Sequence, residues 1–299
     1  MTGIAVDCVL DARAGIGEGA IWSVEDQALW WVDIPAGRLC RFDTETGENR
    51  VWEVGQPVGC FAFKESGGFV LALRDGFFDF DPETGDLQSI GDPEADKPAN
   101  RFNDGTVDYQ GRFYAGTMPI AGASAERGPE GALYRLDPDG SIHTVEGGLF
   151  VTNGLALSPD GRTIYLADTF PAVRAIWAYD YDPDDAVWSN RRVFFDSRQV
   201  DGRPDGGTVD SEGCYWMAGV GGWELVRLTP EGAVDMRIPM PVERPTRIAF
   251  GGRDLDTLYV TSISEKISPG TEDRQPHAGG VFALRVPGVT GLPFPKFGA

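Results

Sequence analysis

Four residues with oxygen-bearing side chains occupy equivalent positions along the chain. Asn103, Asn153 and Asp205 each lie eight residues before a glycine, and Glu18 lies eight residues before Asp26. Carboxylate and amide oxygens are the ligands that hard divalent cations prefer. A cation held by few protein ligands keeps positions for water and substrate, polarises a carbonyl and lowers the pKa of a bound water. The side chains of Glu18, Asn153 and Asp205 therefore predict a metal site.

The segments around these residues repeat. Each copy contains a polar residue, a small turn and a short apolar strand, as in VTNGLALSPDGRTIYLADT at Val151–Thr169. Weaker copies extend the series to a column of six residues, which are Glu18, Gly59, Asn103, Asn153, Asp205 and Thr246. Successive members are 41, 44, 50, 52 and 41 residues apart. Because repeats of about 40–50 residues with short strands are typical of propellers, the sequence predicts an all-β, six-bladed β-propeller.

A propeller places the column around one axis. The first strand of each blade lines the central channel, so equivalent positions on six blades form a ring. Four of the six positions then offer oxygen ligands to the channel. The alternative is structural, because Asn and Asp side chains in turns often accept hydrogen bonds from nearby backbone amides.

The N-terminus is expected to close the ring. Gly3–Leu10 alternates apolar and polar residues, which indicates a strand, but it precedes the first repeat. Gly279–Val286 is the third strand of the last blade. We expect the N-terminal strand to complete that blade and remove its free edge, which makes residues 1–299 one domain. The alternative is a free N-terminal arm.

Composition restricts the function and the location. The chain has 299 residues and a formal net charge of −20, which disfavours nucleic acid as a partner. It contains no apolar run of about 18 residues and no recognisable signal peptide, so we expect neither membrane insertion nor export. The four cysteines lack CxxC spacing and are expected to be free thiols in a reducing cytoplasm: Cys8, Cys40, Cys60 and Cys214. Two histidines are too few for a His-rich zinc site.

Arg101 is a candidate substrate contact together with Asn103. Residues two apart on a strand point to the same face, so the guanidinium and the amide could bind substrate oxygens jointly. The alternative is an Arg101 salt bridge at the rim. Asp104 should face the other way if the chain there is extended.

Other conspicuous residues are read mainly as structural. Asp33 and Asp168 end the second strands of blades one and four and are expected to bind backbone groups between blades. The tryptophans Trp30, Trp31, Trp216 and Trp223 are expected to pack between blades, although Trp223 could reach the channel mouth. The insertion Pro119–Gly131 is either a lid over the channel or an ordinary surface loop. No GxSxG motif is present, and His143 and His277 lack a nucleophile motif, which argues against a Ser-His-Asp mechanism.

Six further motifs run in order through nearly the whole chain: GEGAIW (Gly17–Trp22), RFNDGTVD (Arg101–Asp108), GALYRLD (Gly131–Asp137), TNGLALSPDG (Thr152–Gly161), PDGGTVDSEG (Pro204–Gly213) and AGGVFAL (Ala278–Leu284). In these motifs the chain resembles the SMP-30/gluconolactonase/regucalcin-like family. The resemblance implies a six-bladed propeller with one catalytic divalent cation and hydrolysis of aldonolactones. It implies metal ligation by Glu18, Asn153 and Asp205, and substrate contacts by Arg101 and Asn103.

One departure from the family bears on the substrate. Animal members carry acidic residues shortly after the motif that corresponds to Gly116-Thr117-Met118, whereas Pro119-Ile120-Ala121 follows here. We therefore expect a bacterial-type pentose or hexose lactonase rather than an animal-type substrate preference.

The leading hypothesis is a metal-dependent sugar lactonase. Asp205 is its metal ligand and general base, and Arg101 and Asn103 orient the sugar lactone. The metal is Ca²⁺, Mg²⁺, Mn²⁺ or Zn²⁺, with Fe²⁺ also compatible. The expected partner is a small molecule, and the expected state is a monomer or weak dimer. The alternatives are phosphotriester hydrolysis at the same cation and a non-catalytic Ca²⁺-binding propeller.

Overall fold

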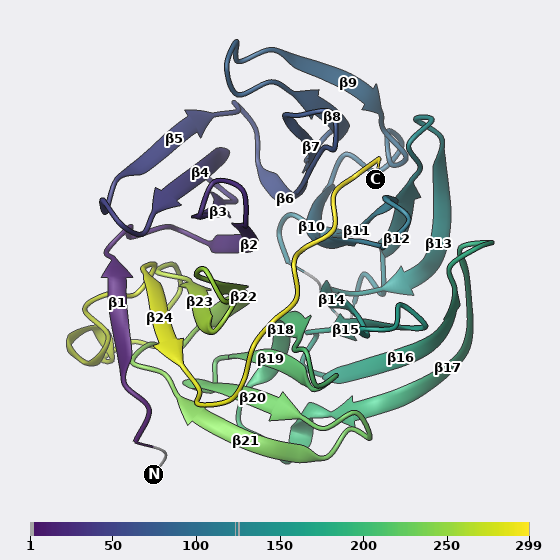
Figure 1. Cartoon of the computed structure of the whole chain (residues 1–299). Coiled ribbons are helices and arrows are strands. Elements are labelled where there is room, and N and C mark those ends of the chain that lie inside the picture. Colours follow the sequence, from purple (N-terminus) through teal and green to yellow (C-terminus); the bar gives the residue numbers. More distant parts are fainter. Residues whose placement is uncertain (1–2, 123, 125, 299) are drawn as a thin grey trace.

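Each predicted repeat forms a four-stranded antiparallel sheet, and the six sheets surround a central axis (Figure 1). The computed structural model describes residues 3–122, 124 and 126–298. The fold is the predicted six-bladed β-propeller. Two 3-10 helices occur among these residues, η1 (Ser197–Gln199) and η2 (Glu272–Arg274), and no described helix is long and apolar enough to cross a membrane.

The strands of each blade follow one another from the channel outward. Blades one and two contain β2 (Gly17–Ser23), β3 (Ala28–Asp33), β4 (Arg38–Asp43), β5 (Asn49–Glu53), β6 (Val58–Phe63), β7 (Phe69–Leu73), β8 (Gly76–Phe80) and β9 (Leu87–Gly91). Blades three and four contain β10 (Asn100–Val107), β11 (Phe113–Pro119), β12 (Gly131–Leu136), β13 (Ile142–Leu149), β14 (Thr152–Leu157), β15 (Thr163–Asp168), β16 (Ala175–Asp182) and β17 (Val187–Asp196). Blades five and six contain β18 (Arg203–Val209), β19 (Tyr215–Val220), β20 (Glu224–Leu228), β21 (Val234–Pro239), β22 (Pro245–Gly251), β23 (Thr257–Ser262), β24 (Val281–Arg285) and β1 (Val6–Leu10).

The N-terminal strand closes the ring as predicted. β1 pairs antiparallel with β24, with Val6 opposite Leu284 and Cys8 opposite Phe282. The last blade therefore combines the two ends of the chain, and the alternative of a free N-terminal arm is wrong. Pairing covers the outer edge of β24, which would otherwise offer unpaired backbone groups to other chains.

The innermost strand of every blade is irregular at the predicted ring. The pairing of the first strand with the second shifts between Glu18 and Ile21, and equivalent shifts occur in the other five blades. Such a β-bulge bends the strand and redirects side chains from strict alternation. Residues next to the ring position can therefore also enter the channel.

Adjacent blades are joined by apolar side chains. Trp30 of blade one packs on Phe69 of blade two, with ring centroids 4.7 Å apart, and Trp216 of blade five packs on Phe250 of blade six. Trp31 lies in a cluster that includes Tyr259 of blade six. These three tryptophans thus confirm the predicted role between blades. The four cysteines are free; Cys8 is half-buried and the others are buried.

Acidic residues secure the chain where it enters a blade. Asp168 accepts hydrogen bonds from the backbone amides of Phe150 and Val151 at 2.8 and 3.1 Å. Asp33 accepts equivalent bonds from Gly15 and Ile16 at 3.2 Å. The prediction that both aspartates bind backbone groups is confirmed.

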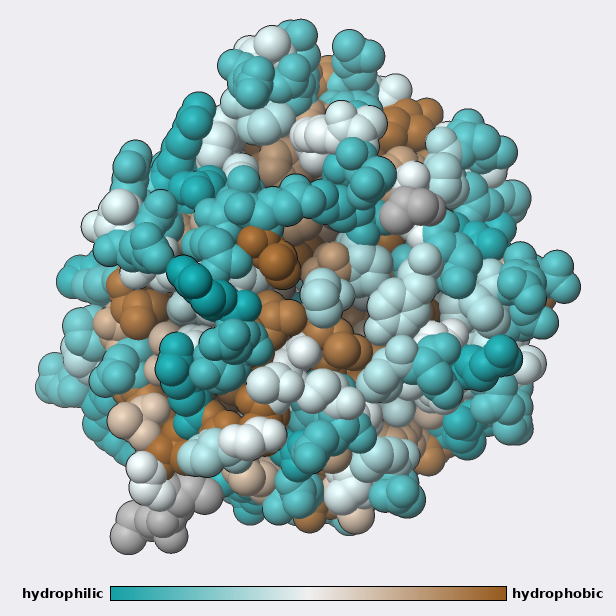
Figure 2. Space-filling model, in the orientation of Figure 1, coloured by the Kyte–Doolittle hydropathy of each residue, from teal (hydrophilic) through white to brown (hydrophobic). Residues whose placement is uncertain are grey.

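The C-terminal tail, residues 286–298, crosses one end of the channel. Figure 1 shows it as the yellow trace that runs over the inner strands, from β24 toward blade three. Thr290 O accepts a bond from Ser211 N of blade five, and Phe297 O accepts one from Glu65 N of blade two. In the same orientation, Figure 2 shows hydrophobic residues gathered near the centre of this face and hydrophilic residues over most of the rim. The tail side chain of Phe294 lies against the ends of the inner strands.

Candidate active site in the central channel

The structure brings together the four predicted oxygen-bearing residues. Glu18, Asn103, Asn153 and Asp205 lie on the innermost strands of blades one, three, four and five, and each side chain is at most 8% exposed. They lie toward the beginning of their strands, whereas the tail covers the other end. The fold therefore places the four residues around the channel, as the repeat register predicts.

A chain of hydrogen bonds fixes the neutral half of the ring. Arg101 Nη1 donates to Asn103 Oδ1 at 2.7 Å, and Asn103 Nδ2 donates to Asn153 Oδ1 at 2.9 Å. Asn153 Nδ2 in turn donates to Thr169 Oγ1 at 2.7 Å. This network fixes both amide orientations, with Asn153 Oδ1 facing Asn103. An amide oxygen has two lone pairs, so Asn153 Oδ1 keeps one for another partner.

The acidic half of the ring consists of two buried carboxyl groups, Glu18 and Asp205, that share a hydrogen bond. Burial, followed by the charge of Asp104, raises the pKa of Glu18 to about 7. Burial and the charge of Glu18 raise the pKa of Asp205 well above its ordinary value. Glu18 Oε2 accepts one bond from Gly19 N at 2.8 Å, and Glu18 is the one hydrogen-bond partner of the Asp205 carboxyl among the described residues.

A divalent cation fits this donor set. Two buried carboxylates with little protein compensation need a positive charge between them, and the free lone pair of Asn153 Oδ1 supplies a third oxygen. The resulting all-oxygen set suits a hard cation.

Asp104 does not face away from the channel. The bulge between Phe102 and Gly105 breaks the alternation on which that expectation rested. Asp104 is 2% exposed, and its Oδ1 accepts a bond from Arg247 Nη1 at 2.7 Å. Its charge also raises the pKa of both Glu18 and Asp205. The Asp104–Arg247 pair thus lies in the channel beside the ring.

Sequence analysis missed Arg247, although the repeat contains a signal for it. The residues that directly follow the ring column are Gly19, Cys60, Asp104, Gly154, Gly206 and Arg247. Only Asp104 and Arg247 are charged, and their charges are opposite. Their blades are three apart, so the two residues start from opposite sides of the six-bladed ring. Gly206 makes room for the pair, because a Cβ there would lie 2.4 Å from Arg247 Cδ.

The two remaining ring positions are structural. A Cβ on Gly59 would lie 2.4 Å from the Phe102 carbonyl, so glycine is required where blades two and three approach closely. Thr246 Oγ1 donates to Gly17 O at 2.5 Å and so ties blade six to blade one.

A second acidic group lies outside the channel. Asp210, Glu212 and Cys214 place their ligand atoms within 4.8 Å of one another. Arg227 Nη2 lies 2.7 Å from Asp210 and 2.5 Å from Glu212, and Trp216 Nε1 also donates to Asp210. A guanidinium therefore already balances these carboxylates, and we read the group as a structural ion-pair network.

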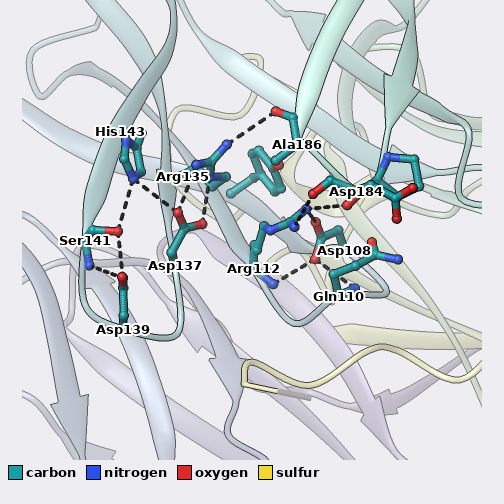
Figure 3. Close-up of polar contacts among 12 residues, drawn as sticks. Asp108, Gln110, Arg112, Arg135, Asp137, Asp139, Ser141, His143, Asp184 and Ala186 are labelled. Carbon is teal, nitrogen blue, oxygen red and sulfur yellow. Dashed lines mark hydrogen bonds and ion pairs between the residues drawn. The ribbon is translucent and has the colours of Figure 1, made fainter.

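Figure 3 shows a surface grouping of Ser141, His143 and Asp137 that has the residue types of a catalytic triad. Ser141 Oγ and Asp137 Oδ2 both contact the same ring nitrogen, Nε2 of His143, at 3.1 Å. A triad needs the serine and the aspartate on opposite ring nitrogens. Asp137 is also held by Arg135 at 2.7 Å. The geometry agrees with the sequence-based argument against a Ser-His-Asp mechanism.

Two predicted features of the rim have different outcomes. The proposed lid, Pro119–Gly131, includes positions 123 and 125, which lie outside the described residues, so the lid stays a prediction. Trp223 of blade five is half-buried and has a φ of 59°. The guanidinium of Arg274, from the loop of blade six, lies 5.0 Å from its ring centroid, so Trp223 contacts the neighbouring blade.

Comparison with known proteins places the chain in a family. The model of the SMP-30/gluconolactonase/LRE-like region matches residues 16–264. The chain is 39% identical to 6-deoxy-6-sulfogluconolactonase of Pseudomonas putida over 97% of each protein, and 36% identical to regucalcin of Xenopus laevis over 98% of each. The crystal structure of a calcium-binding protein, regucalcin, from Agrobacterium tumefaciens is 27% identical and superposes with a TM-score of 0.91 over 99% of this chain and 98% of that one. The chain belongs to the SMP-30/gluconolactonase/LRE-like family.

Proposed function

We propose that the protein is a metal-dependent lactonase that hydrolyses a sugar aldonolactone to the aldonate. The observation that carries the proposal is the pairing of Glu18 and Asp205, two buried carboxyl groups with raised pKa values, beside an amide and arginine network in one channel. The name of the relative from Pseudomonas putida, a gluconolactonase acting on a sulfonated sugar, supports the same reaction class.

The cation would be held by Glu18, Asn153 Oδ1 and Asp205. When bound, it supplies Lewis acidity toward the lactone carbonyl and lowers the pKa of a bound water. Adding Ca²⁺, Mg²⁺, Mn²⁺ or Zn²⁺ separately to the metal-stripped protein distinguishes these four cations.

Arg101 and Asn103 orient the lactone in this proposal. Arg101 uses Nη1 for Asn103 and for Phe102 O, which leaves Nε and Nη2 without a bond to any described residue. These donors suit the hydroxyl and ring oxygens of a sugar. Asn103 spends both amide hydrogens on Asn153 Oδ1 and Thr152 O. It thereby holds Arg101 and Asn153 in a fixed relation and offers its own Oδ1 to a substrate hydroxyl.

Asp205 is the candidate general base. Its only hydrogen-bond partner among the described residues is the Glu18 carboxyl, and a cation held between the two groups would leave Asp205 to accept a proton from the attacking water. A raised pKa makes the group a better proton acceptor near neutral pH than an ordinary aspartate. Water attack on the ester carbonyl forms the C–O bond, the ring C–O bond breaks, and the proton held by Asp205 can pass to the leaving ring oxygen.

The test is proton release from a panel of lactones. Metal-stripped protein is assayed on xylono-, arabinono-, galactono- and gluconolactone, before and after addition of each cation. We expect turnover that disappears on chelation and returns with one or more cations. Turnover that survives complete metal removal, or none on any lactone with any cation, would contradict the proposal. Tight Ca²⁺ binding without hydrolysis would instead favour the non-catalytic propeller.

A further inference from the structure

A layer of arginines lies beside the acidic ring. The residues two positions before the ring column are Ile16, Pro57, Arg101, Val151, Arg203 and Arg244. Three of these six are arginines, on blades three, five and six. This concentration of positive charge is unexpected in a chain with a net charge of −20. Arg101 is used by the amide network, whereas the other two have no such role.

Arg203 and Arg244 have few protein partners. Both are half-buried, and the side chain of Arg203 makes no hydrogen bond or salt bridge with a described residue. Arg244 Nε is buried without a partner, and Arg244 Nη1 reaches only the carbonyl of Glu265 at 3.4 Å. A buried guanidinium nitrogen without an acceptor costs stability, so the unpaired Nε of Arg244 suggests a ligand that supplies an acceptor, and the Arg203 guanidinium has no described protein partner that would compete for that ligand.

Nearby carboxylates are engaged elsewhere. Asp201 and Glu224 both contact Arg237, at 2.5 Å each. Glu243 accepts bonds from the backbone amide and the hydroxyl of Ser268, at 2.8 and 2.6 Å. None of these three carboxylates hydrogen-bonds Arg203 or Arg244, although the bonds from Ser268 and, more weakly, the charge of Arg244 lower the pKa of Glu243.

Arg203 lies near the reacting end of the channel. It precedes Asp205 by two residues on β18, and the charges of Arg203 and Asp205 each favour the ionised form of the other. The neighbouring inner strand, β22, follows Arg244 directly. Arg203 begins β18, so the two arginines enter neighbouring inner strands at the same end of the channel.

We propose that Arg203 and Arg244 bind an acidic group on the substrate, so that the lactone carries a sulfonate, phosphate or carboxylate remote from its ester carbonyl. This inference rests on the proposed lactonase function. Guanidinium groups bind such oxyanions with charge-assisted, often bidentate hydrogen bonds. Asp205 and Glu18 cannot serve as permanent partners for the arginines, because the cation of the proposed reaction needs their charge. A local arginine pair also offsets the repulsion of an anionic substrate by an acidic protein.

The experiment compares gluconolactones that differ only at carbon 6. The neutral lactone is assayed beside its 6-phosphate, its 6-deoxy-6-sulfonate and glucarolactone, in which carbon 6 is a free carboxylate, each with wild type, Arg203→Gln and Arg244→Gln. Arg198→Gln is the matched control, because Arg198 is exposed and paired with Asp196 at 2.8 Å.

We expect wild type to prefer at least one charged lactone. Either test substitution should lower kcat/KM for that lactone at least about tenfold more than for the neutral lactone, as expected for loss of one charge-assisted hydrogen bond. Arg203→Lys should recover part of the loss.

Binding of the open-chain acids separates this inference from the proposed function. Calorimetry compares gluconate with 6-phosphogluconate and the 6-sulfonate, none of which can be hydrolysed. If no lactone is turned over but a charged acid binds more tightly than gluconate and needs Arg203, the anion site stands and the lactonase proposal fails. If neutral and charged lactones are hydrolysed equally, and the arginine variants affect them equally, the lactonase stands and the anion site is wrong. Thermal melts of each variant exclude unfolding as the cause.

Discussion

Asp104 Oδ1 and Arg247 Nη1 lie 2.7 Å apart and join opposite blades of the propeller across its channel. Asp104 comes from β10 of blade three and Arg247 from β22 of blade six. The two side chains are 2% and 4% exposed, so the pair is desolvated as completely as most of the hydrophobic core. Asp104 also accepts bonds from the amides of Gly105 and Leu155, at 2.8 and 3.1 Å, which satisfies the rest of its carboxylate.

Removal of one partner of this pair should be strongly destabilising. Arg247→Met leaves Asp104 as a buried charge without a counter-ion, and Asp104→Leu does the same to Arg247. Each single substitution should lower the free energy of unfolding by about 3–5 kcal/mol, whereas the double substitution should cost less than the sum. Urea denaturation of the four proteins measures this coupling. Glu53→Gln is the control, because Glu53 and its partner Arg38 form an exposed pair at the surface, where about 0–1 kcal/mol is expected. Strict additivity in the double variant would show that the two charges do not depend on each other.

The register of the repeat was enough to predict the ring, but not the directions of its neighbours. The spacing of Glu18, Asn153 and Asp205 placed them on equivalent strands, and the fold follows from the same periodicity. Asp104 is expected to face away from the channel only if the strand is regular, and the bulge between Phe102 and Gly105 removes that condition. Bulges bend the inner strands around the axis, and glycine marks them in only some copies: Gly19 and Gly154 have φ of 58° and 63°, whereas blade three has Asp104 at the equivalent position. The course of the tail is also beyond sequence reasoning, since its contacts join blades that are distant in the chain.

The stability of the metal-free protein should fall as pH rises from about 5.5 to 8. Burial raises the pKa of Glu18 to about 7 from an ordinary value of 4.5, and that of Asp205 rises as well. Between the unfolded and folded pKa values, the folded chain retains protons that the unfolded chain has released. Stability is therefore lost as pH rises through this window. We expect the apparent Tm to drop by roughly 5 °C, given about 2–4 °C per kcal/mol for a chain of this size class.

A saturating cation should remove this pH dependence at pH 8, because it replaces the protons between the two carboxylates. The double variant Glu18→Gln/Asp205→Asn should show a flat profile without metal. Scanning calorimetry at the two pH values gives both results. An equally stable metal-free wild type at pH 5.5 and 8 would mean that the two carboxyl groups are not held together in a desolvated channel.

Truncation of the tail should affect stability more than catalysis. Deletion of residues 290–299 exposes the ends of the inner strands that Leu292 and Phe294 now cover. These residues are half-buried, so the loss should be about 2–4 kcal/mol by area. Metal affinity and kcat/KM should stay within about threefold, since the ring lies toward the other end of those strands. Phe294→Ala should reproduce part of the stability loss. A truncation that abolishes metal binding while the protein remains folded would place the site at the wrong end of the channel.

The sharpest test of the ring itself compares Asp205→Ala with Asn103→Ala. Asp205 supplies one of two carboxylates and the candidate base, so its removal should abolish metal binding at micromolar concentrations. Activity should stay low even at saturating metal, because loss of a general base costs about 10²–10⁴-fold. Asn103 donates to Asn153 Oδ1 and accepts from Arg101, so its removal frees both without taking away a charge. Metal affinity should then change only a few-fold, whereas kcat/KM should fall sharply. Calorimetric titration of metal into the stripped variants, followed by lactone assays at saturating metal, separates the two effects. If Asn103→Ala loses the metal as completely as Asp205→Ala, then Asn103 is a ligand, and the division of the ring into a cation site and a substrate site is wrong.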